Sequence, residues 1–359
     1  MDLIKISSKQ PIPFDIVITC MRLSKKIYST QMEFNNILNE RKTVILNNRH
    51  YFMGIAMLLV VLYHGYCATE DVLYLPFKRG YIGVDIFLYF SGLGLCYSYE
   101  KNALSNFYKR RLIRILPLYF VWAFIHYLYN ICINGIEYSS TDVLCLLTTV
   151  SYYGVGSVRS NWYLSALLLL YLLFPFFYRA IKYAGLRVVT FLLISSFFLL
   201  SVYDFEWYHS ALIGRIYIFS LGVFSFFLFK NVKLKSLWIF LFASLVVGGQ
   251  YIIFARYQFL GSAIAAPMLI LVLALMPMTI VTNKPIKYIG EKSLEIFVAN
   301  CFVMLTYPLI ATFLEGEYGG GKILALIYLF LNIIYSVPVI YINKVLQSLA
   351  KVSHRSTNG

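Results

Sequence analysis

The sequence predicts an all-α, polytopic integral membrane protein with about ten transmembrane helices and one short re-entrant or interfacial segment. Hydrophobic residues make up 60% of the 359 residues, and charged residues make up only 13%. The apolar residues fall in repeated blocks of about 20 residues, the length that a helix needs to cross a bilayer. These blocks leave no stretch long enough for a soluble domain beyond the amino-terminal arm.

Eleven apolar blocks follow one another along the chain, and each is a candidate span. They cover residues 51–68, 80–98, 112–133, 142–156, 162–178, 187–203, 211–229, 236–254, 263–281, 293–313 and 323–343. The block 142–156 is the shortest, and Gly154, Gly156 and Asn161 lie at or just beyond its end. We therefore interpret 142–156 as dipping into the bilayer or lying at its interface, which leaves ten spans.

The basic residues support ten spans and orient them. With ten spans, one side of the membrane holds only six of the 31 Lys and Arg residues, namely Lys78, Arg79, Arg159, Arg215, Arg256 and Lys322. The positive-inside rule makes the other side cytoplasmic, and both termini lie there. A full span at 142–156 would instead invert every later loop. The sequence thus predicts a multi-pass protein of the plasma (inner) membrane with both termini in the cytoplasm.

The chain divides into a cytoplasmic arm (1–49), a transmembrane domain (50–343) and a cytoplasmic tail (344–359). An amphipathic stretch near 17–38 suits a helix on the inner leaflet, although a plain cytoplasmic arm fits equally well. The net charge of +15 has its origin in the cytoplasmic loops, and it suits contact with anionic membrane lipids. No clustered aromatic and basic face suggests nucleic acid as a partner.

His64 and Asp85 are ionisable residues inside apolar blocks. Such residues are costly at membrane depth unless they face a protein interior or a cavity, so they are candidates for function. The orientation places both about one helical turn from the outer ends of adjacent spans. A histidine near a carboxylate can act as a general base, and we expect His64 to be the base and Asp85 its orienting partner. The alternative is that His64 only pins two helices together through a hydrogen bond.

A basic run, NFYKRRLIRILP, opens the third span on the cytoplasmic side. Arg110 and Arg114 share one helix face because they are four residues apart. Orientation of the chain in the membrane explains one or two such charges. An arginine as deep as Arg114 needs a partner, and a phosphate suits the guanidinium fork. We therefore expect a phosphorylated ligand to enter from the cytoplasm.

The outer loop around Glu206 combines acidic and aromatic residues in the run DFEWYH, which is typical of sugar binding. Aromatic anchoring at the membrane interface also explains Trp207 and Tyr208. The chain has no GxSxG motif, no His/Glu cluster with metal-ligand spacing and no glycine-rich phosphate loop. We expect no metal site and no permanently bound cofactor.

Six segments in order resemble the membrane acyltransferase-3 family, whose ten-span enzymes O-acylate bacterial surface carbohydrates. They are GIAMLLVVLYH, YIGVDIFLYFSGLGL, FYKRRLIRILPLYFV, NWYLSALLLLYLLFP, RIYIFSLGVF and YIGEKSLEIFVAN, and together they cover roughly residues 50–310. The resemblance implies transfer of an acyl group, usually acetyl, from cytoplasmic acyl-CoA to a sugar hydroxyl at or beyond the outer face. The partners would be acetyl-CoA or another acyl-CoA, and a carbohydrate or lipid-linked glycan.

The resemblance also implies residue roles. His64 would be the catalytic histidine, Asp85 the acidic residue of the second motif, Ser91 and Gly92 its helix-packing end, Arg111 and Arg114 donor-side residues, and Asn161, Trp162, Ser165 and Arg215 acceptor-side residues.

Two positions depart from the family pattern. The family usually has an arginine where this chain has Met53, and Arg49 lies one turn earlier on the same face, about 6 Å lower along the helix. We expect Arg49 to contribute to donor binding. Many members have a histidine where this chain has Asn300, onto which we carry no catalytic role.

A transporter or flippase for polysaccharide or lipid-linked sugars is the alternative function. It would predict half-helices broken by Gly and Pro at matching positions of two halves, and the sequence shows no such pair. A non-catalytic scaffold, the third possibility, would tolerate replacement of His64 and Asp85.

Overall fold

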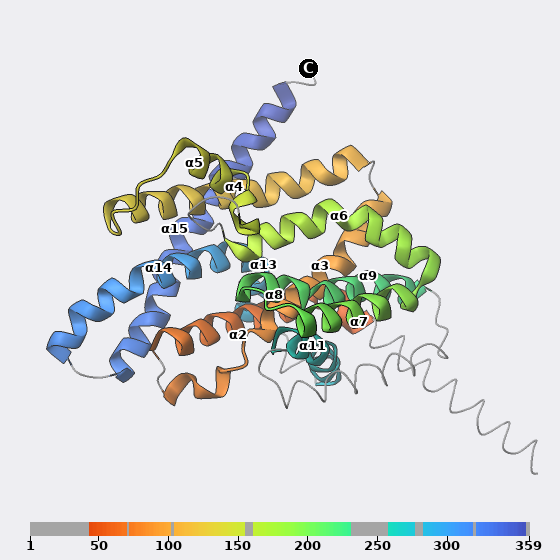
Figure 1. Ribbon diagram of the computed structural model, residues 1–359, viewed down its shortest axis with the longest axis horizontal. Helices are drawn as coiled ribbons and strands as arrows, with labels where there is room; N and C mark the ends of the chain where they lie inside the picture. Colours follow the sequence, from red (N-terminus) through yellow and green to blue (C-terminus); the bar gives the residue numbers. More distant parts are fainter. Residues whose placement is uncertain are drawn as a thin grey trace, which may run out of the picture. The chain divides into compact units, whose positions relative to one another are not determined.

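The computed structural model describes residues 43–69, 72–101, 104–154, 161–230, 258–276, 283–318 and 321–356. The chain divides into two units, 1–47 and 48–359, and the second is described here. Within the described residues every regular element is a helix (Figure 1), so the predicted all-α class is confirmed. The stretch near 17–38 and the block 236–254 lie outside the described residues.

The helices of the second unit follow one another without strands between them in the described ranges. In chain order they are α2 (Arg49–Thr69), η1 (Val72–Phe77), α3 (Ile82–Lys101), α4 (Leu104–Cys132), α5 (Ser140–Leu147), η2 (Val150–Tyr153), α6 (Trp162–Ala184), α7 (Leu186–Val202), α8 (Trp207–Ile213), α9 (Ile216–Lys230), α11 (Gln258–Leu275), α13 (Lys284–Glu291), α14 (Ser293–Tyr318) and α15 (Gly321–Ser356).

Seven segments of the described chain are long and apolar enough to cross a membrane. They are Arg49–Ala68, Ile82–Lys101, Asn106–Cys132, Trp162–Ala184, Trp207–Phe229, Ser293–Phe313 and Leu326–Leu349. Two shorter apolar helices, Leu186–Val202 and Gln258–Ala274, fall on the predicted blocks 187–203 and 263–281. Together these segments account for every predicted span except 236–254. The protein is a multi-pass membrane protein.

The block 142–156 forms only short helices in its described part. Helix α5 has eight residues, a length of about 12 Å against the roughly 30 Å of the bilayer core. Ser139 and Asp142 close its start as a capping box. Thr148 is its C-cap, and Thr149 between α5 and η2 has a left-handed backbone (φ 65°). As predicted, the described part of this block, 142–154, forms no helix long enough to cross the bilayer.

The block 211–229 is predicted as one span, but in the structure its residues belong to two helices. Helix α8 ends at Ile213 and α9 begins at Ile216, with Gly214 and Arg215 forming the turn between them. A buried turn leaves room for the large Arg215 side chain, which is 1% exposed. Helix α4, in turn, begins at Leu104 rather than at residue 112. The basic run of the third span is therefore helical.

Glycines bring two pairs of helices into direct backbone contact. Helices α3 and α9 pack side by side (Figure 1), with Gly92 against the backbone of Phe219 and Gly222 against the backbone of Tyr89. A β-carbon at either glycine would collide with a carbonyl oxygen. Small residues at such positions let membrane helices approach closely. Gly92 therefore has the packing role that the family resemblance implied.

Helices α2 and α13 are held in the same reciprocal way. Gly54 of α2 lies against the carbonyl group of Ile286, and Gly290 of α13 lies against the carbonyl group of His50. Helix α13 begins with Asn283 as its N-cap, whose side chain accepts a hydrogen bond from the amide of Ile286. The contact between α2 and α13 holds the end of α2 that contains Arg49.

Candidate active site

His64 of α2 pairs with an amide rather than with a carboxylate. Its Nδ1 lies 2.6 Å from Oδ1 of Asn300, a fully buried residue of α14. The Nδ2 group of Asn300 donates to the Tyr328 hydroxyl and to Oδ1 of Asn332, both at 3.1 Å. Helix α15 thus supplies the groups that hold Asn300, and α14 supplies the group that holds His64.

This network determines which nitrogen of His64 carries the proton. Asn332 donates its own Nδ2 to the backbone carbonyl of Tyr328 at 2.9 Å, so its Oδ1 is the atom that faces Asn300. Asn300 must therefore direct Nδ2 toward α15 and Oδ1 toward His64. An amide oxygen only accepts, so Nδ1 of His64 is the protonated nitrogen. The lone pair is left on Nε2, where a general base needs it.

His64 lines a cavity of about 720 Å³, within the size range of small-molecule sites in proteins. Aromatic rings dominate its wall. The cavity brings together Asn161, Trp162 and Arg215 from the predicted acceptor side. Ser165 is buried in α6 and Glu206 is exposed at the start of α8, and neither belongs to the cavity lining that the described residues form.

Asn161 has two structural contacts in addition to its place in the cavity wall. Its Oδ1 accepts from the backbone amide of Leu164 at 3.0 Å, which caps the start of α6. Its Nδ2 donates to Sγ of Cys301 on α14 at 3.3 Å. The residue therefore links α6 to the helix that positions His64.

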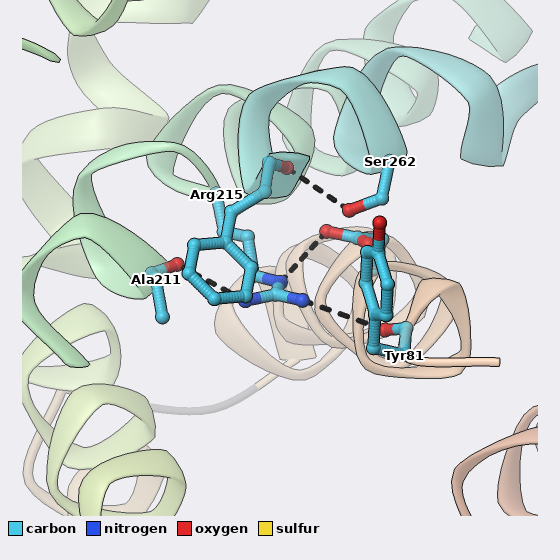
Figure 2. A network of polar contacts seen from close by, with 6 residues as sticks. Tyr81, Ala211, Arg215 and Ser262 are labelled. Carbon is cyan, nitrogen blue, oxygen red and sulfur yellow. Dashed lines mark hydrogen bonds and ion pairs between the residues drawn. The ribbon is translucent and has the colours of Figure 1, made fainter. Parts of the chain in front are cut away.

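Asp85 forms a buried ion pair with Arg215, at 2.9 Å between Oδ1 and Nε. The two side chains are 0% and 1% exposed. Figure 2 shows the guanidinium also donating to the backbone carbonyls of Ala211 and Tyr81, each at 3.4 Å. At membrane depth a charge of this kind persists only when it is paired and hydrogen-bonded. The pair therefore joins α3 to the turn between α8 and α9.

The Arg215 guanidinium also lies close to two aromatic rings. Its Cζ is 4.7 Å from the ring centre of Phe259 and 5.4 Å from that of Trp162. Ser262, near the pair, donates to the carbonyl of Phe259 at 3.0 Å (Figure 2). Arg215 thus fixes one aromatic wall of the cavity, and its charge is already matched by Asp85.

The expected pairing of Asp85 with His64 is corrected by this geometry. Asp85 lies on the α3 stripe that also contains Tyr89 and Gly92 at helical spacing, and this stripe faces α9. Its carboxylate therefore meets Arg215 at the start of α9. His64 faces α14, where Asn300 takes the orienting position. Asn300, which stands where many family members have a histidine, is thus the residue that holds His64.

A second, much smaller cavity of about 50 Å³ brings together Arg49, Arg111 and Arg114. Met53, which stands where the family usually has an arginine, also lines this cavity. Its expected substitute, Arg49, therefore faces the same space. The guanidinium of Arg49 lies directly over Gly94 of α3, where a β-carbon would come within 2.7 Å of Nη1. We refer to this cavity as the arginine pocket.

The arginine pocket carries positive charge without a matching acid in its described lining. Nε of Arg111 is buried and has no hydrogen-bond partner among the described residues. A buried donor left in this state is costly, and an anionic oxygen would satisfy it. The pocket is therefore suited to bind an anion with several oxygen atoms, such as a phosphate. Arg110, the fourth predicted donor residue, lines an adjoining cavity instead.

Phe297 of α14 lines both the arginine pocket and the His64 cavity. Its ring packs against that of Tyr163, with centroids 4.7 Å apart. Along α14, Leu294 faces the arginine pocket, and Cys301 and Met304 face the His64 cavity. These positions follow helical spacing, so one stripe of α14 runs from the arginines to the histidine.

Several cavity residues were not predicted from the sequence. Trp122 and His126 are four residues apart on α4, with their rings stacked at 4.7 Å. Tyr152 of η2 donates its hydroxyl to the carbonyl of Tyr208 at 2.7 Å. Burial raises the pKa of Tyr152, so this hydroxyl stays protonated. An apolar helix gives no signal about which of its faces points inward, so only the tertiary structure identifies these residues.

Fold and site together define a multi-pass membrane protein in which a charged pocket and a histidine cavity share a wall. A family model described as an acyltransferase domain matches residues 51–343. The chain therefore belongs to the membrane acyltransferase-3 family, and the protein is a membrane acyltransferase. The match includes most of α15, which supplies Tyr328 and Asn332. No curated protein and no solved structure matches the chain.

Proposed function

We propose that the protein moves an acyl group, acetyl in the first instance, from cytoplasmic acyl-CoA to a hydroxyl of a cell-surface or lipid-linked carbohydrate. The observation that carries the proposal is the position of Phe297, which lines both cavities. One of these cavities suits a phosphorylated donor and the other holds a base. A thioester that passes Phe297 comes within reach of His64 while its phosphates stay with the arginines.

The donor side follows from the charges of the arginine pocket. Acyl-CoA carries a diphosphate, and the planar guanidinium groups of Arg49, Arg111 and Arg114 match its oxygen atoms. A phosphate oxygen would also satisfy the buried Nε of Arg111. The diphosphate does not take part in the bond change, so these residues contribute binding energy for the donor.

The reaction uses His64 as the base. Nε2 accepts the proton of the sugar hydroxyl while the hydroxyl oxygen attacks the thioester carbonyl. The tetrahedral intermediate then breaks the C–S bond, and the leaving sulfur takes the proton back from the imidazolium. The products are the sugar ester and free CoA. Asn300 keeps Nδ1 as the protonated nitrogen, so the imidazole presents its lone pair to the hydroxyl.

The acceptor side is the aromatic wall of the His64 cavity. Trp122, Trp162 and Trp207 line it, and such rings offer flat apolar faces to the C–H faces of a sugar. Trp162 and Trp207 pack edge to face at 6.2 Å. Only six of the 31 Lys and Arg residues fall on the predicted outer side of the membrane. By the positive-inside rule, this distribution supports a cavity that opens outward from the plasma membrane.

Vesicles reconstituted with the purified protein test the proposal. Acetyl-CoA labelled in the acetyl group is supplied on the side of the basic loops, together with a lipid-linked glycan. We expect labelled glycan and one free CoA per acetyl transferred. Movement of glycan across the vesicle membrane without CoA release would instead establish the flippase alternative. Comparison of surface glycan NMR spectra from a deletion strain and its parent identifies the natural acceptor.

A further inference from the structure

A third cavity, of about 310 Å³, adjoins the arginine pocket. Arg114 and Leu294 line both spaces. Arg110 lines only the third cavity, although it is one helical turn from Arg114 on α4. The walls come from α4, α15 and the junction of α13 with α14. The donor-side arginines are thus divided between two neighbouring spaces.

The walls of the third cavity combine positive charges with amide groups. Arg110 and Lys292 contribute positive charge. Asn343 of α15 is 3% exposed, and its Nδ2 donates to Oε1 of Glu295 at 2.9 Å. Gln347, one turn further along α15, directs Nε2 toward Oδ1 of Asn343 at 3.4 Å. The buried amide and carboxylate groups are therefore held in fixed orientations.

We propose that this cavity binds the 3′-phosphoadenosine end of acyl-CoA, an inference that rests on the proposed function. Coenzyme A carries its diphosphate and its 3′-phosphate on opposite sides of one ribose. The arginine pocket suits the diphosphate, and Arg114 is shared at the boundary. Arg110 binds the 3′-phosphate, because Lys292 is already paired with Glu295 at 3.8 Å. The amide of Gln347 hydrogen-bonds the adenine.

The acidic side chains of the cavity argue for a nucleotide over a simple anion. Glu295 is 7% exposed, and Glu291 lines the same space. Glu291 lies 3.9 Å from Lys287 and Glu295 lies 3.8 Å from Lys292, so the cavity is not a purely cationic site for a small anion. Carboxylate oxygens also accept hydrogen bonds from the amino group of a base. A ligand that joins a phosphate to a purine satisfies both kinds of wall.

Calorimetric titration of the full-length protein in detergent with free CoA and with 3′-dephospho-CoA tests the inference. We expect the wild-type protein to bind CoA about tenfold more tightly, because one charge-assisted contact is lost with the 3′-phosphate. Arg110→Ala should bring this ratio close to one. Lys109→Ala is the matched control, since Lys109 is the neighbouring exposed charge on α4 and lines neither cavity. It should keep the tenfold ratio.

The adenine contact has its own variant and probe. Gln347→Leu should weaken CoA binding while leaving the binding of 4′-phosphopantetheine, which lacks adenosine, unchanged. An unaltered CoA affinity in this variant, or a tenfold ratio that survives in Arg110→Ala, overturns the inference.

The remaining outcomes separate the inference from the proposed function. A wild-type protein that does not distinguish CoA from 3′-dephospho-CoA overturns the inference alone. A protein that binds neither compound overturns both the donor assignment and the inference. CoA binding with the expected preference, but without acyl transfer to any glycan, supports the nucleotide site and contradicts the proposed acceptor chemistry.

Discussion

The arginine pocket and the His64 cavity share Phe297 but differ in how their polar groups are satisfied. At the His64 cavity, Asp85 neutralises Arg215 through Oδ1 and Asn300 holds the imidazole, while Oδ2 of Asp85 has no hydrogen-bond partner among the described residues. In the arginine pocket, Arg111 has a buried nitrogen without a partner among the described residues. The charges of the first region are therefore matched within the protein, whereas we propose that the second is completed by its ligand. Changes in the His64 cavity should therefore affect turnover or stability, and changes in the arginine pocket should affect donor binding.

The largest effect is expected from His64→Gln. Removal of a general base lowers kcat by about a hundredfold to ten-thousandfold, and donor affinity should not change because the arginines are intact. Initial rates of labelled ester formation and CoA titration measure the two quantities. A well-inserted variant that still acylates glycan at the wild-type rate would support the helix-pinning interpretation.

Asp85→Asn should lower the stability of the folded protein as well as the rate of acyl transfer. The change leaves the buried Arg215 charge without its counter-ion, which costs about 3–5 kcal/mol. Thermal unfolding in detergent detects the loss. The double variant Asp85→Asn with Arg215→Met removes both charges and should be more stable than Asp85→Asn alone. If the double variant is less stable, Arg215 does not depend on Asp85.

Asn300→Ala should lower kcat by about 10- to 100-fold, because the orientation of the His64 ring and the position of its proton are no longer fixed. The donor KM should stay constant. Tyr328→Phe removes only one of the two groups that hold Asn300, so its effect on kcat should be smaller. Equal kcat values for wild type and Asn300→Ala would show that the amide is not needed to position the histidine.

The smallest effect is expected from Gly94→Ala. The new methyl group collides with the guanidinium of Arg49, and displacement of this side chain should raise the donor KM about fivefold, a cost near 1 kcal/mol. The kcat value at saturating donor should not change. Steady-state kinetics with varied acyl-CoA gives both numbers. A change in kcat without a change in KM would mean that the two regions are not separable.

The two regions also differ in how far the sequence predicts them. Arg114 and His64 stand inside apolar blocks, so their charge alone marks them. The partner of His64 comes from α14 and is held by α15, helices that the linear pattern does not bring together. Asp85 illustrates the same limit of the linear pattern. Its predicted depth in the membrane placed it level with His64, but depth does not show which helix a side chain faces. Its position on the stripe with Tyr89 and Gly92, which faces α9, decided its partner.

Helix α2 contains both Arg49 and His64 in one uninterrupted segment. At 1.5 Å per residue the two positions are about 22 Å apart along the helix axis. Rocking of other helices cannot alter this spacing, which the covalent geometry of a single helix fixes. The enzyme would therefore select donors by length. A thioester on too short an arm would be held at its phosphates yet never meet the base, and hydrolysis or mistransfer of small cytoplasmic thioesters would be avoided without a dedicated editing step.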